Sequence, residues 1–476
     1  MQQKPWRQLA FVVGEPALAL LSGGVLYVVI SRASGAELLG VYALALAWLT
    51  VFQGVSSFGI PEFILREAGA YGRDSATQVV HALLLGLGCG VAAICLMLAM
   101  VRLMGYQADL ARPISIVSLA LIPAFLNLAC RSVFVAQRQL HVPFLAALIE
   151  VAIMVPASLY LLLSGYGAVA LMVTFVAAKF ASASVVVTLL FRSVFPALPP
   201  LDLSVLMKTA RTVFAFGVGT VLGVLSMRIN LIMVSLWLSI ETVGHYAAAA
   251  KLMEFCLIGP AMFAQLLLTR VAHSFVMRSD RDPNRFAPWF EVLFALVLPI
   301  CVGIWVFAGP ILETLFGKPF GDGLWILRVL MIFVLTESAD VTMSAILKAA
   351  NRQRQDAFFV GLNLLVNVAL SLMLLPVLGA IGAAIGRVCG GAASATTRHL
   401  LIGKVLTELD WLRCGWKPAL ISFGAGSICY LLLGVEPPAW LMLFYVLSVA
   451  ALLKLSSGFS FAAVKDIMSV PSRAAE

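Results

Sequence analysis

Long apolar stretches separated by short polar connections recur from one end of the chain to the other. Each stretch is about twenty residues long, the length that an α-helix needs to cross a hydrocarbon core of ~30 Å. The predicted spans are 9–30, 39–62, 78–101, 113–135, 143–164, 167–191, 212–238, 244–270, 289–313, 323–349, 357–376, 379–402, 416–434 and 438–457. Nothing between them is long enough to form a separate soluble domain. The pattern predicts an all-α polytopic membrane protein with about fourteen transmembrane helices.

Composition agrees with this interpretation. Of the 476 residues, 62% are hydrophobic and 12% are charged, and the mean hydropathy is +1.02. Ordinary soluble domains carry about a quarter charged residues. The first apolar stretch could be mistaken for a signal peptide with ASGA at 33–36 as its cleavage site. That stretch is too long for a signal peptide and is broken by Glu15 and Pro16, so we interpret it as the first span.

Basic residues concentrate in alternate connections, which is the pattern that orients membrane proteins with their positive loops in the cytoplasm. One set of connections holds Arg66, Arg73, Arg138, Arg192, Lys208, Arg211, Arg278, Arg281, Arg285, Arg352, Arg354, Lys404, Arg413 and Lys417. The other set holds only Arg32, Arg102, Arg112 and Lys318. Both termini are therefore predicted to be cytoplasmic. The net charge of +9 follows this topology, so no nucleic-acid partner is expected.

The chain contains an internal repeat. GAELLGVYALALA at 35–47 aligns without gaps on SIETVGHYAAAAK at 239–251, and AQRQLHVPF at 136–144 aligns on ANRQRQDAF at 350–358. Two units with an even number of spans share one orientation, which is a known transporter plan with a cavity between the halves.

The repeat predicts three parts. They are a six-helix bundle over 1–200, a second six-helix bundle over 201–405, and helices 13 and 14 with a tail over 406–476. Clusters of small residues, GLGCG at 86–90, GVGTVLG at 217–223 and AIGAAIG at 380–386, predict close helix packing. The eight cysteines lack metal-binding spacing, and we expect neither a metal nor a cofactor.

Ionisable residues lie inside the predicted spans, where a charge costs about 3 kcal/mol or more unless it meets a partner or water. The basic ones are Arg131, Lys179, Arg228, Lys251, Arg328 and Arg387, and the acidic ones are Glu15, Glu150, Glu254, Glu337 and Asp340. Arg328 and Arg131 are near span ends and could snorkel to the surface. The other cations are deeper. We interpret the basic set as lining a cavity for an anionic substrate, with buried ion pairs between helices as the alternative for each residue.

Two pairs have a helical spacing. Lys251 and Glu254 share a helix face and can partly neutralise each other. Glu337 and Asp340 also share a face, and because two like charges resist ionising together we expect a protonatable pair. Arg228 and Lys251 are predicted at similar depth on neighbouring helices, where they would form a site for a pyrophosphate.

The paired ExxGxYA hairpins, the A[QN]RQ…F loops and the fourteen spans resemble the polysaccharide-export branch of the multidrug/oligosaccharidyl-lipid/polysaccharide (MOP) flippase superfamily, above all the O-antigen and exopolysaccharide repeat-unit flippases. The resemblance implies translocation of an undecaprenyl-pyrophosphate-linked oligosaccharide to the outer leaflet by ion- or proton-coupled alternating access. It also implies a bacterial inner membrane location, and a polysaccharide polymerase and chain-length machinery as partners.

One position departs from the family, whose members often carry an Asp two residues after the basic residue of helix 7. Here that position is Asn230, so Glu254, Glu337 or Asp340 would have to bind the coupling ion. Two transporter alternatives stay open: a multidrug/cation antiporter of the same fold, and a lipid II-type peptidoglycan-precursor flippase. A membrane glycosyltransferase or polymerase is disfavoured because the outer loops are short, so the protein is expected not to be an enzyme.

Overall fold

The computed structural model describes residues 5–195, 200–276, 287–350, 352–403, 411–433 and 440–455, and every regular element within them is helical. The chain forms two compact units, Met1–Ala247 and Ala248–Glu476. Their boundary lies inside α9, whereas the predicted division after residue 200 follows the repeat and stays a prediction. The predicted cytoplasmic loop at 271–288 and the C-terminal tail lie largely outside the described residues.

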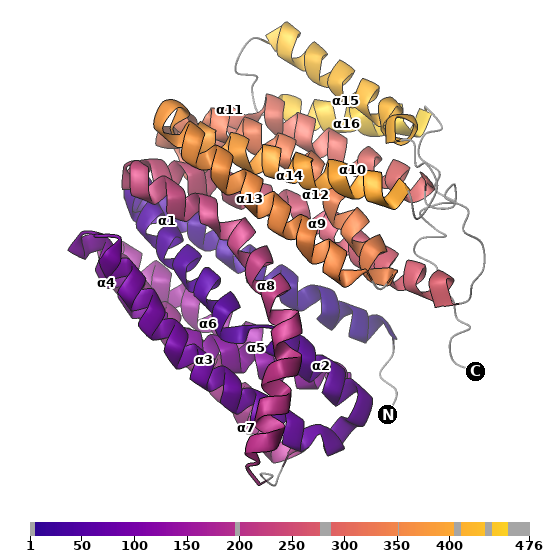
Figure 1. The fold of residues 1–476 in the computed structure, drawn as a ribbon. Coiled ribbons are helices and arrows are strands. Elements are labelled where there is room, and N and C mark those ends of the chain that lie inside the picture. The colour runs from indigo at the N-terminus through magenta and orange to yellow at the C-terminus, as the bar shows by residue number, and fades with distance from the viewer. Residues whose placement is uncertain are drawn as a thin grey trace. The chain divides into compact units, whose positions relative to one another are not determined.

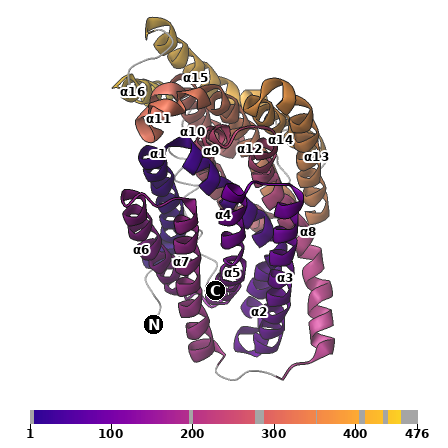
Figure 2. The same cartoon turned by 90° about the vertical axis from the view of Figure 1, so that its left-hand side faces the viewer.

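The first unit contains α1 (Pro5–Ser57), α2 (Ile60–Tyr71), η1 (Gly72–Ser75), α3 (Ala76–Leu103), α4 (Ala108–Ser118), α5 (Leu121–Ala136), α6 (His141–Leu163), α7 (Ala168–Leu189), η2 (Leu190–Val194), α8 (Leu203–Trp237) and the start of α9 (Ile240–Val276). In this unit α6 and α7 run side by side, and α8 packs on α1 and α3 (Figures 1 and 2).

The second unit contains the rest of α9, α10 (Ala287–Val306), α11 (Ala308–Phe316), η4 (Lys318–Gly323), α12 (Leu324–Ala349), α13 (Gln353–Leu378), α14 (Ala380–Gly403), α15 (Trp411–Leu433) and α16 (Trp440–Leu455). Here α12, α13 and α14 form one closely packed group, and α15 packs on α10 (Figure 1). A helix therefore coincides with each of the fourteen predicted spans.

Several predicted boundaries are wrong. The first two spans form one long helix, α1, which bends at Gly35, where φ is 79°. The second span ends at Ser57 rather than at 62, because the backbone turns at Phe58 and Gly59, both with positive φ. The predicted loop at 66–77 is then largely α2 and η1. The fourth span is interrupted between α4 and α5, and the ninth between α10 and α11.

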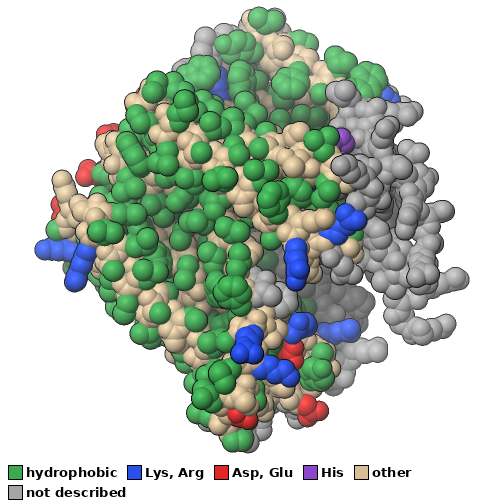
Figure 3. Space-filling model, viewed as in Figure 1, with side chains coloured by type: hydrophobic (Ala, Val, Ile, Leu, Met, Phe, Trp, Pro, Cys, Tyr) green, Lys and Arg blue, Asp and Glu red, His purple; other side chains and the backbone are tan. Residues whose placement is uncertain are grey.

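Within the described residues, nine helices are long and apolar enough to cross a membrane by length and composition, with α1 counted once. The helices α12, α14 and α15 are not among them. The count of fourteen spans therefore stays a prediction. On the face seen in Figure 3, hydrophobic side chains cover most of the described surface, as expected of a protein surrounded by lipid.

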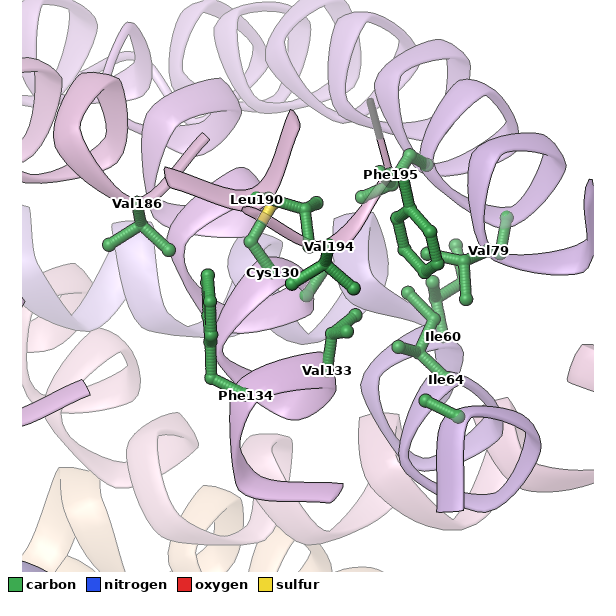
Figure 4. Close-up of a cluster of buried hydrophobic side chains, with 14 of the residues drawn as sticks. Ile60, Ile64, Val79, Cys130, Val133, Phe134, Val186, Leu190, Val194 and Phe195 are labelled. Carbon is green, nitrogen blue, oxygen red and sulfur yellow. The ribbon is translucent and has the colours of Figure 1, made fainter. Parts of the chain in front are cut away.

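Each unit has its own apolar core. In the first unit the core joins α2, α3, α5 and α7 with η2, and the side chains drawn in Figure 4, among them Ile60, Phe134 and Leu190, are fully buried. In the second unit Val302, Phe307 and Tyr445 belong to a smaller cluster that joins α10, α15 and α16. The Tyr445 hydroxyl donates to the carbonyl of Pro299 at 3.1 Å, so the one phenol group of this cluster has a hydrogen-bond partner.

The small-residue clusters pack helices only in part as predicted. A Cβ at Gly86 would overlap the ring of Phe125, and one at Gly217 would overlap the ring of Phe58. By contrast, Gly88, Gly219 and Gly223 have no neighbouring atom within 4 Å of an added Cβ, so close packing does not explain them. The last cluster packs most tightly, and is described below with α13.

Candidate functional site

The repeated hairpins pack on one another within the first unit. A Cβ at Gly40 would overlap the carbonyl oxygen of Ile240 and lie 3.0 Å from the nitrogen of Gly244. A Cβ at Gly244 would in turn overlap the carbonyl oxygen of Ala36. Two glycines at equivalent positions of the repeat thus allow two helix backbones to touch. The predicted tight connector is also present, since α8 ends at Trp237 and α9 begins at Ile240.

Two predicted cations of the first unit are paired with acids on other helices. Arg131 on α5 forms an ion pair with Glu15 on α1, so it does not depend on snorkelling. On α7 the ammonium of Lys179 lies 2.5 Å from a carboxylate oxygen of Glu150 on α6, and 5.4 Å from the centre of the Phe175 ring. All four charged side chains are partly exposed, between 18% and 26%. The contacts match the alternative interpretation, in which each charge has a partner on a neighbouring helix.

The predicted pyrophosphate pair is divided between the units. Arg228 is partly buried on α8 of the first unit and makes contacts within the described residues, and Asn230 nearby is fully buried. Lys251 belongs to the second unit, where its ammonium lies 3.3 Å from Glu254, as the helical spacing predicts. A joint site of Arg228 and Lys251 stays a prediction.

The second unit contains an ionic network centred on Arg398 of α14. Its Nη1 donates to Oδ2 of Asp340 on α12 at 2.5 Å, and its Nη2 lies 3.0 Å from Oδ1 of Asp356 on α13. Ser394 donates to Asp340 at 3.0 Å, and the ammonium of Lys348 lies 3.5 Å from Asp356. Two cations balance two anions, which is what allows the central arginine to be only 1% exposed. We call these five residues the Arg398 network.

Glu337, one turn before Asp340 on α12, has a different environment. Its Oε2 is buried without a hydrogen-bond partner among the described residues, and Asp340, Arg387 and Arg398 are the charged groups within electrostatic reach. Arg387 on α14 is 3% exposed and lies 4.6 Å from the centre of the Phe333 ring. The two acids predicted as one pair therefore differ, because Asp340 is held in an ion pair and Glu337 is not.

Arg328 is not at the surface, so the prediction that it could snorkel is wrong. The side chain is buried on α12, with Nε donating to the carbonyl of Trp305 at 3.1 Å. The guanidinium lies 4.8 Å from the ring centres of both Trp305 and Trp325. Indole faces attract cations, and this contact replaces part of the hydration that Arg328 has lost.

Sequence reasoning missed Arg398, Asp356 and Lys348. Arg398 lies near the predicted end of its span, and the other two flank the polar connection before α13, so all three resemble ordinary interfacial charges. Asp356 and Arg398 lie on different helices, and the sequence does not show that these helices meet. A usable signal was the density of acids and bases at the neighbouring ends of α12, α13 and α14.

Polar residues also join α13 to α14. Asn363, Asn367 and Ser371 follow one another at four-residue spacing on α13, and all three are buried. They face the small residues of α14, since a Cβ at Gly390 would lie 2.6 Å from the carbonyl oxygen of Asn363, and one at Gly386 would overlap the hydroxyl of Ser371. Small residues on one helix and short polar side chains on the other are typical of tight contacts in lipid.

Outside the spans, Asp202 caps the start of α8. Its carboxylate accepts the N–H of Ser204 at 2.8 Å, and hydrogen bonding to the side chain and the backbone of Ser204 holds the pKa of Asp202 below its ordinary value. The N–H of Asp202 itself donates to Nε2 of His81 at 2.9 Å, while Nδ1 of that buried histidine lies 2.6 Å from the carbonyl of Thr77. Within the described residues, no group of three His, Cys, Asp or Glu is placed to hold a metal ion.

Known structures share this fold. The chain aligns with the lipid II flippase MurJ in an inward closed conformation at a TM-score of 0.77 and 14% identity, covering 97% of this chain and 100% of that one. An inward-facing multidrug resistance MATE transporter of the MOP superfamily aligns at 0.67 and 18%, covering 82% and 93%. A MOP superfamily transporter from Pyrococcus furiosus, described by the reverse polarity of its binding pocket, aligns at 0.60 and 16%, covering 84% and 95%.

At these identities the likeness establishes the all-helical MOP transporter fold. No curated protein shows a significant match to the chain. Residues 29–322, more than half of the chain, match the family described as "Polysaccharide biosynthesis protein". The chain, which combines that match with the fold of MOP superfamily flippases and transporters, belongs to this polysaccharide biosynthesis protein family.

Proposed function

We propose that this protein is a flippase that moves an undecaprenyl-pyrophosphate-linked oligosaccharide, a polysaccharide repeat unit, from the cytoplasmic to the outer leaflet of a bacterial inner membrane. The observation that supports this most is the match of residues 29–322 to a polysaccharide biosynthesis family on a flippase-type fold. The mechanism is alternating access, without a chemical reaction on the substrate. Both termini are cytoplasmic in this proposal, and a polysaccharide polymerase and chain-length machinery receive the product.

The substrate's pyrophosphate binds the intramembrane cations. Arg131, Lys179 and Lys251 have carboxylate partners that offset the cost of burying them while the site is empty. A pyrophosphate carries more negative charge than one carboxylate and can replace it as partner. Arg228 is the strongest candidate ligand, because a guanidinium matches phosphate oxygens in a bidentate geometry. Arg387 is the corresponding candidate of the second unit.

Complementation of a flippase-null strain tests the site. Arg228→Ala should abolish export of the polysaccharide, and Arg228→Lys should keep part of it because the charge remains while the bidentate fork is lost. Lys251→Ala should be milder, since Glu254 already offsets part of its charge. Insertion and protein level must match the wild type. Normal export by Arg228→Ala would leave Arg228 with a structural role and remove the proposed site.

Coupling is assigned to the carboxylates inside the spans. Because Asp340 is bound to Arg398, while Glu15, Glu150 and Glu254 each contact a base, Glu337 is the carboxylate that we expect to bind and release a proton. Transport into vesicles at several pH values should then lose its pH dependence in Glu337→Gln. An unchanged pH profile in that variant would place coupling elsewhere.

Two other substrates fit the same fold. The high coverage by a lipid II flippase favours a peptidoglycan precursor as the second candidate, and the MATE likeness favours a cationic drug as the third. Deletion of the gene distinguishes the three candidate substrates. Cytoplasmic-side accumulation of an undecaprenyl-pyrophosphate oligosaccharide supports our proposal. Accumulation of lipid II, or loss of dye efflux with normal polysaccharide, contradicts it.

A further inference from the structure

Arg328 is a buried cation without an anionic partner in the described part of the chain. Its contacts there are the carbonyl and ring of Trp305 and the ring of Trp325, and its Nη2 is buried without a hydrogen bond. The ion pairs of the structure reach Arg131, Lys179, Lys251 and Arg398, but none reaches Arg328. A charge buried in a membrane protein normally has a counter-ion, and none of the described carboxylates supplies one to Arg328.

A cavity of about 690 Å³ lies between α10, α12 and α15, and the Trp305 side chain separates it from Arg328. Trp305 and Tyr430 line it, and both are neighbours of the Arg328 guanidinium, the first by ring contact and the second within electrostatic reach. Most of the other lining side chains are apolar, as Met331 and Leu335 are. The volume lies within the range of ~300–1,000 Å³ that is typical of small-molecule sites.

The cavity opens at the surface of the second unit. Three of its lining residues, Ile332, Phe423 and Leu431, are 46%, 56% and 80% exposed. In a membrane-spanning unit, exposed apolar side chains of this size face the lipid chains. Lipid is therefore the solvent that fills the cavity entrance, and a bilayer lipid reaches it without crossing the protein.

The cavity is also separate from the Arg398 network. At 3.6 residues per turn, Arg328, Met331 and Leu335 form one stripe along α12, while Glu337 lies about half a turn around the helix from Arg328. The face that carries Asp340 contacts α14 through Ser394 and Arg398. The two faces of α12 thus serve different environments, one ionic and one open to lipid.

We propose that this cavity binds an anionic phospholipid of the surrounding bilayer, with its phosphate beside Arg328 and an acyl chain in the apolar part. The phosphate supplies a counter-ion, and guanidinium and phosphate match in shape and charge. Trp305 and Trp325 are themselves 37% and 55% exposed, so rotation of an indole uncovers the guanidinium. This assigns Arg328 to a lipid site instead of the predicted substrate cavity.

Native mass spectrometry of the purified, delipidated full-length protein tests the site. The two probes are phosphatidylglycerol and diacylglycerol with the same acyl chains, which differ by the anionic headgroup. We expect wild type to bind one phosphatidylglycerol about tenfold more tightly than diacylglycerol, as one charge-assisted hydrogen bond predicts. Arg328→Gln should bind both equally, and Arg328→Lys should keep most of the preference.

Ser427 lines the cavity, whereas the neighbouring Ile428 is exposed and does not. Ser427→Trp should therefore weaken binding of both lipids, and Ile428→Trp should not. Lys318→Gln, which removes an exposed charge just before α12, is the control for net charge. An unchanged preference in Arg328→Gln, or unchanged binding in a folded Ser427→Trp, would overturn the proposal. Displacement of phosphatidylglycerol by an equimolar undecaprenyl phosphate would also overturn it, by identifying an isoprenoid lipid as the occupant.

Discussion

The two units make the same interhelical contact with different chemistry. In the first unit Asn127 of α5 donates to Ser182 of α7 at 2.7 Å, and Ser182 donates onward to the carbonyl of Ala146 at 3.0 Å. In the second unit Ser394 of α14 donates to Asp340 of α12. The repeat aligns Asn127 to within one residue of Asp340, and Ser182 to within two residues of Ser394. Neighbouring positions of the repeat thus carry a neutral amide in one unit and a carboxylate in the other.

A buried carboxylate has a requirement for charge compensation that a buried amide lacks. An amide is satisfied by hydroxyls and carbonyls, but a buried carboxylate also needs a positive charge. The second unit supplies it from Arg398, which in turn brings in Asp356 and Lys348. In the first unit the pairs Arg131–Glu15 and Lys179–Glu150 are partly exposed, and Glu150 also acts on Arg131. The acid in place of an amide therefore goes together with a buried network across three helices.

The largest effect should come from removing the centre of that network. Arg398→Met leaves Asp340 and Asp356 buried with one partial counter-ion, Lys348, and should lower the stability of the second unit by about 3–5 kcal/mol. Thermal unfolding in detergent measures this. The triple variant Arg398→Met, Asp340→Asn, Asp356→Asn removes the charges together and should recover most of the loss. Failure of the triple variant to recover would show that packing, not charge, is the source.

The second prediction introduces into the first unit the kind of buried carboxylate that the second unit carries. Asn127→Asp places a carboxylate next to Ser182, where the arginine one turn away, Arg131, is already paired with Glu15, and should cost about 3 kcal/mol at neutral pH. The loss should shrink in acid, where the new carboxyl is protonated and hydrogen-bonds as the amide did. Unfolding midpoints of wild type and variant at pH 4 and pH 8 give the comparison. Equal losses at both pH values would rule out charge as the cause.

These contacts also show what the sequence can and cannot predict. Pattern and spacing located the helices, the Lys251–Glu254 pair and the repeated hairpin, because all three depend on local periodicity. The contact of Gly40 with Gly244 follows from the same repeat, although only the structure shows that their backbones touch.

The Arg398 network could not be predicted in this way. The position of a residue along its helix gives its depth in the membrane, but it does not give the neighbouring helix that the side chain contacts. Arg398 lies close to the predicted end of its span, yet it is almost fully buried between Asp340 and Asp356. Arg328 was misplaced for the same reason, since proximity to a span end did not reveal that Trp305 and Trp325 enclose it. Which helix faces which is a tertiary property, and it decides the environment of each charge.

A smaller effect is expected for the ion pairs of the first unit. Lys179→Met removes the ion-pair partner of Glu150, but the carboxylate is 18% exposed and Arg131 stays within electrostatic reach. The cost should be about 1–2 kcal/mol, between the values of exposed and fully buried pairs. The same unfolding assay applies, with Glu150→Gln, Lys179→Met as the matched control that should regain the loss. A cost as large as that of Arg398→Met would remove the distinction between the units.

The smallest effect concerns a charge outside the spans, Asp202, which depends on neither unit's ion pairs. Its hydrogen bond from Ser204 lowers the pKa of Asp202 below 3.8 in the folded protein, so the stabilisation is present above the unfolded value. It is lost as pH falls through the folded pKa, when the carboxylate takes up a proton. Asp202→Ala should therefore lower the unfolding midpoint more at pH 6 than at pH 3. Asp202→Asn retains a good capping side chain and should stay close to wild type at pH 6. An equal deficit of Asp202→Ala at both pH values would show that the charge of the cap is not what stabilises the start of α8, since the hydrogen bond to His81 comes from the backbone N–H and is kept in the variant.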